Sequence, residues 1–98
     1  MAKIRWTTEA EKWLHDIYDY ISLDNPDAGH KVVWEIYNKI QLLSKYPKIG
    51  QKYRRGKEGE IRIYLYGHYR IAYLLRGTEY IDILGIFHGA LDIDHYIV

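Results

Sequence analysis

Three residues in the second half of the chain carry side chains that could together cleave RNA: Arg62, Arg70 and His88. Such a reaction needs a base for the 2′-hydroxyl, an acid for the leaving oxygen, and cations for the charge that develops on the phosphate. The arginines would supply the positive charge, and His88, with His68 as a second choice, would carry the proton. The pattern predicts that Arg62 and Arg70 share one face of adjacent strands. The alternative is a structural role, because an arginine on a sheet face is more often solvated or ion-paired and a histidine at a strand end is more often only a cap.

Other catalytic chemistries find less support in the sequence. Ser22 and Ser44 both lie in helix-like stretches without the sharp turn that exposes a nucleophilic serine. The five histidines are scattered and show no i, i+4 pairing of the kind that holds zinc on a helix. Asp92, Asp94 and His95 form only a short acidic tail. The sequence therefore predicts no metal and no cofactor.

Three segments with strand-like alternation would position Arg62, Arg70 and His88. They cover residues 60–66, 69–75 and 80–88. Each connection contains a glycine, which permits a tight turn. In the first segment Arg62, Tyr64 and Tyr66 alternate with Ile or Leu, which is the period of a pleated strand. We expect a three-stranded antiparallel meander with one face covered by a second layer, and with its Arg and Tyr face turned to solvent or a partner.

The first half of the chain predicts two helices that would form the second layer. Thr8 and Glu11 have the spacing of a capping box, and apolar residues recur at helical spacing from there to about residue 23. Asn25 is a good N-cap, and Pro26 suits the first position of a second helix that should reach about residue 45. Helices joined by so short a connection form an antiparallel hairpin.

With a short strand at residues 3–6, the predicted order is β-α-α-β-β-β. The fold class is α+β: an antiparallel sheet with an N-terminal helical hairpin packed on one face. A length of 98 residues, 48% hydrophobic and 28% charged, fits one domain covering residues 1–98. The absence of cysteine and of any apolar run near 18 residues predicts a cytoplasmic protein without a membrane segment.

Charge is distributed unevenly along the chain. The stretch from residue 45 to 62 holds seven bases and two acids, a net charge of +5, whereas the rest of the chain carries −4. A basic cluster on a nearly neutral protein indicates an anionic partner, either nucleic acid or an acidic peptide. A solvated loop is the alternative interpretation. No internal repeat or low-complexity segment interrupts the chain.

Several short motifs, in their order and spacing, resemble the RelE/ParE toxin superfamily over nearly the whole chain. They are Asn25-Pro26, Pro47-Lys48-Ile49-Gly50, Tyr69-Arg70-Ile71-Ala72-Tyr73 and Ile83-Leu84-Gly85-Ile86-Phe87-His88-Gly89. The last of these is most similar to the ParE branch, the plasmid-stabilisation toxins. The sequence departs from that pattern at Gln51, where Arg is common, and at Gly85 and Leu91, which are often basic in ParE relatives.

The resemblance implies the fold already predicted and a type II toxin held inactive by a cognate antitoxin that wraps around it. ParE-like members poison DNA gyrase without a recognised nuclease site, whereas RelE-like members cut mRNA on the ribosome. The favoured hypothesis is a gyrase-poisoning toxin; the alternative is a ribosome-dependent mRNA endonuclease. An inactive or repurposed antitoxin-binding module is the third possibility.

The hypotheses assign different roles to the same residues. Arg62, Arg70 and His88 would bind the target, or would be catalytic if the protein is a ribonuclease. The antitoxin would cover the helical hairpin and a sheet edge, because two large apolar residues fall outside the predicted core stripe and the basic stretch would attract its carboxylates. The predicted antitoxin-binding residues are Trp34, Leu42, Arg54, Arg55 and Lys57. A toxin–antitoxin hetero-oligomer is the expected assembly.

Overall fold

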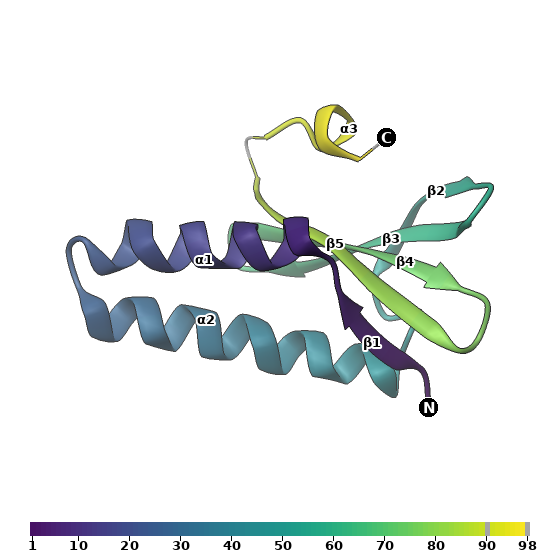
Figure 1. Cartoon of the computed structure of the whole chain (residues 1–98), viewed down its shortest axis with the longest axis horizontal. Helices are drawn as coiled ribbons and strands as arrows, with labels where there is room; N and C mark the ends of the chain where they lie inside the picture. Colours follow the sequence, from purple (N-terminus) through teal and green to yellow (C-terminus); the bar gives the residue numbers. More distant parts are fainter. Residues whose placement is uncertain (90, 98) are drawn as a thin grey trace.

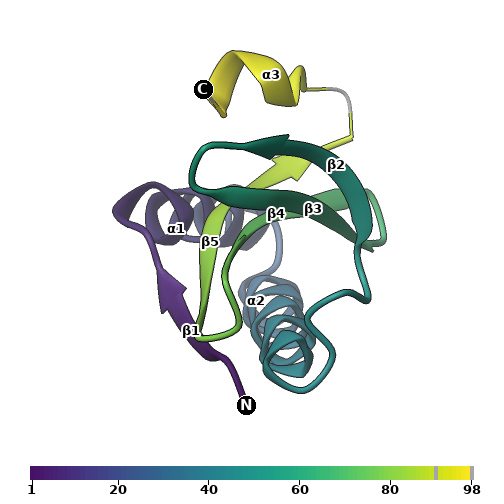
Figure 2. The ribbon, with the colours of Figure 1, turned by 90° about the vertical axis from the view of Figure 1, so that its right-hand side faces the viewer.

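A hairpin of two long helices covers one face of a five-stranded sheet, and a short C-terminal helix lies on the other side of the strands (Figures 1 and 2). The computed structural model describes residues 1–89 and 91–97. Its elements are β1 (Lys3–Trp6), α1 (Thr8–Ser22), α2 (Pro26–Gln41), η1 (Leu42–Ser44), β2 (Gln51–Gly56), β3 (Gly59–Tyr66), β4 (Tyr69–Arg76), β5 (Tyr80–His88) and α3 (Ile93–Tyr96). Within these residues, none of the helices combines the length and the apolar composition of a membrane-spanning segment.

The strands follow the order β1-β5-β4-β3-β2 across the sheet. Strands β2 to β5 form antiparallel pairs, and the three-stranded meander predicted from the sequence corresponds to β3, β4 and β5. The α+β fold class with its helical hairpin is therefore confirmed. Two features were not predicted: β1 pairs with β5 in parallel, and residues 51–56, which the predicted β-α-α-β-β-β order leaves outside its strands, form the edge strand β2. Every residue of β2 is exposed, so no hydrophobic alternation marks it.

The two long helices begin at side-chain caps. Thr7, one residue before the predicted capping box, accepts a hydrogen bond from the Ala10 amide at 3.1 Å and donates one to the Ile83 carbonyl at 2.6 Å. The second bond ties the start of α1 to β5, so the tertiary contact selects Thr7 over Thr8 as the cap. Asn25 caps α2 as predicted, and Pro26 is its first residue.

Both faces of the sheet are apolar and both are covered. The larger core, between the sheet and the hairpin, contains Ile36, Ile40, Leu43, Ile71, Tyr73, Ile81, Ile83 and Ile86. The smaller core, on the α3 side, contains Ile61, Ala72, Leu74, Phe87, Ile93 and Ile97. The prediction that the Arg and Tyr face would be turned to solvent or a partner was wrong, because Tyr64 and Tyr66 pack against the larger core. Their rings lie near Lys39, and the Tyr66 hydroxyl bonds to Glu35.

Candidate functional site

Arg62 and Arg70 lie on opposite faces of the sheet. The loop between β3 and β4 has two residues, so Tyr66 pairs with Tyr69 and each even-numbered residue of β3 faces an odd-numbered residue of β4. Arg62 is therefore opposite Tyr73, on the hairpin side, and Arg70 is opposite Leu65, on the α3 side. The prediction that the two arginines share a face was wrong for this reason.

Arg62 is occupied by contacts within the chain. Its Nε donates to Glu60 Oε2 at 2.5 Å, and its Nη1 donates to the carbonyls of Lys48 and Gly50 at 3.2 and 2.6 Å. The hydrogen bond from Arg62 lowers the pKa of Glu60, with help from the nearby lysines, although burial opposes the shift. Only 15% of the Arg62 side chain is exposed. Its role in the structure is to hold the segment that leads into β2.

Tyr73 binds the same segment, residues 47–50, from the core side. Its ring is fully buried, and its hydroxyl donates to the Pro47 carbonyl at 2.7 Å and accepts from the Gly50 amide at 3.0 Å. Burial raises the pKa of the Tyr73 hydroxyl, so it stays protonated. A Cβ on Gly50 would lie 2.7 Å from Tyr73 Oη and 2.8 Å from the Ile63 carbonyl, which leaves room for glycine alone. The motifs at residues 47–50 and 69–73 thus contact each other here. Their joint presence was the only feature of the sequence that pointed to this contact.

Arg70 and His88 do not join Arg62. Arg70 donates to the Leu91 carbonyl on the α3 side of the sheet. His88 pairs with Tyr69 in the ladder, and its ring lies 6.0 Å from the Tyr69 ring. Because Tyr69 and Tyr73 are four residues apart in β4, His88 and Arg62 are separated by about 13 Å along the strand direction. Arg62, Arg70 and His88, predicted to act together, therefore lie in three separate parts of the sheet.

The basic stretch forms the outer edge of the sheet, which we call the basic edge: Lys48, Lys52, Arg54, Arg55 and Lys57, all exposed. A bulge in β2 between Lys52 and Arg54 places both Lys52 and Arg55 beside Glu60, at 3.9 and 3.6 Å. Arg54 instead turns to the α3 side, where it donates to the Ile97 carbonyl at 2.5 Å.

The bulged residue, Tyr53, also turns to the α3 side. Its hydroxyl donates to Asp94 at 2.5 Å, and this bond is the main cause that raises the pKa of Tyr53. Arg54 lies 3.6 Å from the same carboxylate. Edge strand β2 therefore holds the C-terminal segment through Tyr53 and Arg54.

A second exposed surface lies on the outside of the helical hairpin. This hairpin surface is lined by Trp6, Leu14, Tyr18, Val33, Trp34 and Tyr37. Trp34 is 68% exposed. The rings of Trp6 and Tyr37 stack with their centroids 6.2 Å apart. Leu42 is also exposed but does not line this surface.

The predicted antitoxin-binding residues belong to separate surfaces. Trp34 lies on the hairpin surface, which reaches strand β1 through Trp6. Arg54 and Arg55 lie in β2, at the opposite edge of the sheet, and Lys57 lies in the turn that follows it. One partner segment can contact all of them only by passing around the molecule.

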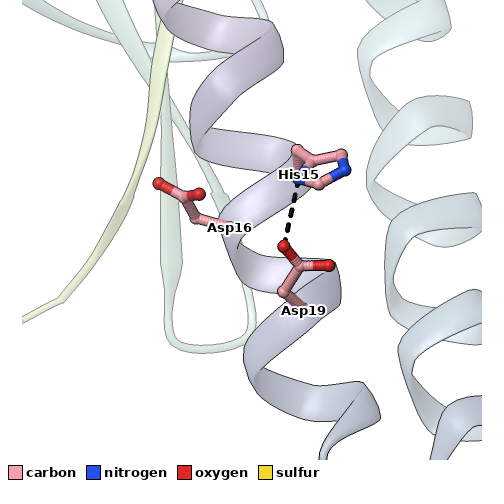
Figure 3. Close-up of side chains that lie close together, drawn as sticks. All are labelled: His15, Asp16 and Asp19. Carbon is pink, nitrogen blue, oxygen red and sulfur yellow. Dashed lines mark ion pairs between the residues drawn. The ribbon is translucent and has the colours of Figure 1, made fainter.

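A possible metal-ligand group lies on α1, where His15 Nδ1 is 3.2 Å from Asp19 Oδ2. Figure 3 shows these two residues with Asp16, and the ligand atoms of the three side chains all lie within 4.8 Å of one another. All three residues are exposed, and an exposed carboxylate pair with a histidine is an ordinary surface contact, so we assign no ion to them. In the acidic tail, Asp92 caps α3 and Asp94 pairs with the basic edge.

Comparison with known proteins gives a consistent result. A family model described as the ParE toxin of the type II toxin–antitoxin system parDE matches residues 4–93. A solved structure from the chromosomal ParDE system of P. aeruginosa superimposes with a TM-score of 0.73 at 23% identity, covering 90% of this chain and 96% of that one. The RelBE2 toxin–antitoxin complex of Mycobacterium tuberculosis gives a TM-score of 0.59 at 26% identity, covering 89% and 96%.

A protein of Sinorhizobium fredii named "Putative toxin Y4kP" is 41% identical over 49 residues. That match covers 50% of this chain and 51% of the relative, so the chain spans about half the length of the curated relative it matches.

Proposed function

We propose that this chain, which belongs to the ParE toxin family of type II toxin–antitoxin systems, is a toxin that acts by binding DNA gyrase and is neutralised by a cognate antitoxin. The proposed function requires surfaces that bind other proteins and does not require a catalytic site. A toxin that poisons another enzyme carries out no chemical step of its own, whereas an mRNA endonuclease needs its acid, base and cations around one phosphate.

The observation that carries the proposal is the separation of Arg62, Arg70 and His88. The arginines lie on opposite faces of the sheet, and each donates to backbone carbonyls of its own chain. A phosphodiester in contact with either guanidinium would be out of reach of the other. This arrangement supports binding over catalysis by these three residues.

The hairpin surface supports a partner that docks through apolar side chains. Trp34 is the largest exposed aromatic side chain on it, and aromatic residues dominate the energy of many interfaces. The adjacent edge strand β1 offers backbone groups for strand addition beside this surface. An amphipathic antitoxin segment would use both, and its acidic residues would then reach the basic edge if the segment continues around the sheet.

Induction of the gene in growing cells tests the proposal. Gyrase poisoning predicts filamentous cells with DNA damage while protein synthesis continues. An abrupt halt of translation, with mRNA cut at ribosomes and chromosomes intact, would favour the endonuclease alternative instead. Normal growth with retained antitoxin binding would identify an inactive antitoxin-binding module.

A further inference from the structure

We propose that the basic edge binds the phosphate backbone of duplex DNA directly, through Lys48, Lys52, Arg55 and Lys57. This inference extends the proposed binding to gyrase. A toxin docked on gyrase would, in addition, contact the DNA that gyrase has bound. The inference rests on the proposed function only in one respect: gyrase, the proposed target, is where the chain would encounter DNA.

The first support is uncompensated charge. Glu60 is already bonded to Arg62 at 2.5 Å, and Lys52 and Arg55 share the same carboxylate at longer distances. Glu58, the other acid of this stretch, pairs with Arg76. Within the described residues, Lys48 and Lys57 form no ion pair. The four exposed cations therefore outnumber the acids beside them. The resulting excess of positive charge attracts a polyanion.

The second support is the shape of this edge. The β2–β3 hairpin projects at the end of the molecule opposite the turn between the long helices (Figure 1). A six-residue strand spans about 20 Å, and a duplex presents about six phosphates of each strand over that length. Lys52 and Arg55 gather around Glu60 within that length, so the edge presents a compact cationic cluster that several neighbouring phosphates could contact.

The third support concerns what the edge can offer to a protein partner. Strand addition needs a continuous row of outward backbone groups, and the bulge at Tyr53 interrupts that row. Arg54 and Tyr53 are also engaged with the C-terminal segment. The free features of this edge are long cationic side chains, which suit phosphates better than a paired strand.

The fourth support is that Lys48 sits on a fixed segment. Its backbone carbonyl accepts from Arg62, and the neighbouring residues Pro47 and Gly50 are bonded to the buried Tyr73 hydroxyl. Preorganised cations lose less conformational entropy on binding than cations on a mobile loop. An antitoxin with carboxylates on the same edge would exclude DNA, which adds a second route to neutralisation.

The test is direct binding of the purified chain to a fluorescent 30-base-pair duplex of mixed sequence, measured by anisotropy over a range of KCl concentrations. Four phosphate contacts predict that log K falls against log salt with a slope of about −3.6. Replacing Lys52→Gln and Lys57→Gln together should reduce the slope to about −1.8 and weaken binding by roughly one to two orders of magnitude at 0.1 M salt. The matched control, Lys3→Gln with Lys12→Gln, removes the same charge from exposed lysines elsewhere and should leave the slope unchanged.

Binding that survives in the Lys52/Lys57 variant, or that the control weakens equally, would overturn the proposal. So would binding of an Asp- and Glu-rich peptide without binding of DNA, since the edge would then serve acidic protein segments alone. A gyrase cleavage assay on the same proteins separates the two proposals. Gyrase-dependent breakage without direct DNA binding refutes only this inference, and DNA binding without breakage refutes only the proposed function.

Discussion

Arg62 and Arg70 are eight residues apart in sequence and lie on opposite faces of the sheet. Arg62 donates to the carbonyls of Lys48 and Gly50, whereas Arg70 donates to the Leu91 carbonyl. Arg62 fixes the segment that enters β2, and Arg70 bonds to the segment that follows β5. Both side chains therefore organise the surfaces around the sheet. Loss of toxicity in a variant of either residue would be the expected result of this structural role as well as of a direct one.

Arg62→Ala should reduce stability measurably. The substitution removes the bonds to the Lys48 and Gly50 carbonyls and leaves Glu60 without its nearest cation, so we expect a loss of about 1–3 kcal/mol. Urea unfolding measures it. The control, Arg55→Ala, removes an exposed arginine and should stay within about 0.5 kcal/mol of the wild type. Equal effects of the two substitutions would contradict the role given to Arg62.

Tyr73→Phe isolates one hydroxyl. The ring still fills the core, but the Gly50 amide and the Pro47 carbonyl lose their shared partner, which should cost about 1–2 kcal/mol in thermal or urea unfolding. The same change at the exposed Tyr46 should have little effect. If Tyr73→Phe proves neutral, the hydroxyl does not hold the segment before β2.

Stability should fall as acid titrates Asp82. Burial alone would raise the pKa of Asp82, but the bonds from Arg5 and Arg76 outweigh it and hold the pKa below its ordinary value. In the window below about pH 4 the unfolded chain then binds more protons than the folded one. The contribution of this carboxylate is complete above that window and is lost as the pH falls through the lower, folded pKa.

Asp82→Asn tests this assignment. It should lower the unfolding free energy at pH 7 by about 1–3 kcal/mol, because the guanidiniums of Arg5 and Arg76 lose their charged acceptor. It should also flatten the decline in stability between pH 5 and pH 2. Asp24→Asn, at an exposed position, should change neither quantity. A variant with the same acid dependence as the wild type would show that other carboxylates cause the decline.

The sequence predicted the elements with strong local signals and missed those that depend on pairing. Asn25 and Pro26 marked the start of α2 correctly because capping chemistry is local. Strand β2 was missed because an edge strand with every residue exposed has no apolar alternation. The shared face of Arg62 and Arg70 was predicted wrongly because it depends on strand register, which the two-residue loop fixes.

The candidate site was predicted unevenly for similar reasons. Trp34 and Leu42 were predicted to lie outside the core stripe, and both are exposed. The opposite placement of Trp34 and Arg55 could not be seen, because it follows from the order of the strands. The departure at Gly85 also has a physical reason: a Cβ there would lie 2.4 Å from the Phe87 ring. A larger residue at this position would have to displace that ring.

Trp34→Ala should weaken antitoxin binding while sparing the fold. The side chain is 68% exposed, so its loss should change stability by less than about 0.5 kcal/mol. As a central aromatic contact it should cost at least about 2 kcal/mol of binding energy, roughly 30-fold in Kd, by calorimetry with the cognate antitoxin. The comparison is Tyr20→Ala, an exposed aromatic of α1 outside the hairpin surface. Unchanged affinity for the Trp34 variant would exclude the hairpin surface from the complex.

The central claim is that this chain acts as a toxin by binding and not by cutting RNA. The most direct measurement incubates the folded wild-type chain in parallel with purified gyrase on supercoiled plasmid and with translating ribosomes on a defined mRNA. The account predicts gyrase-dependent DNA breakage and intact mRNA. Cleaved mRNA with untouched gyrase would contradict it, and would make Arg62, Arg70 and His88 candidates for catalysis despite their separation across the sheet.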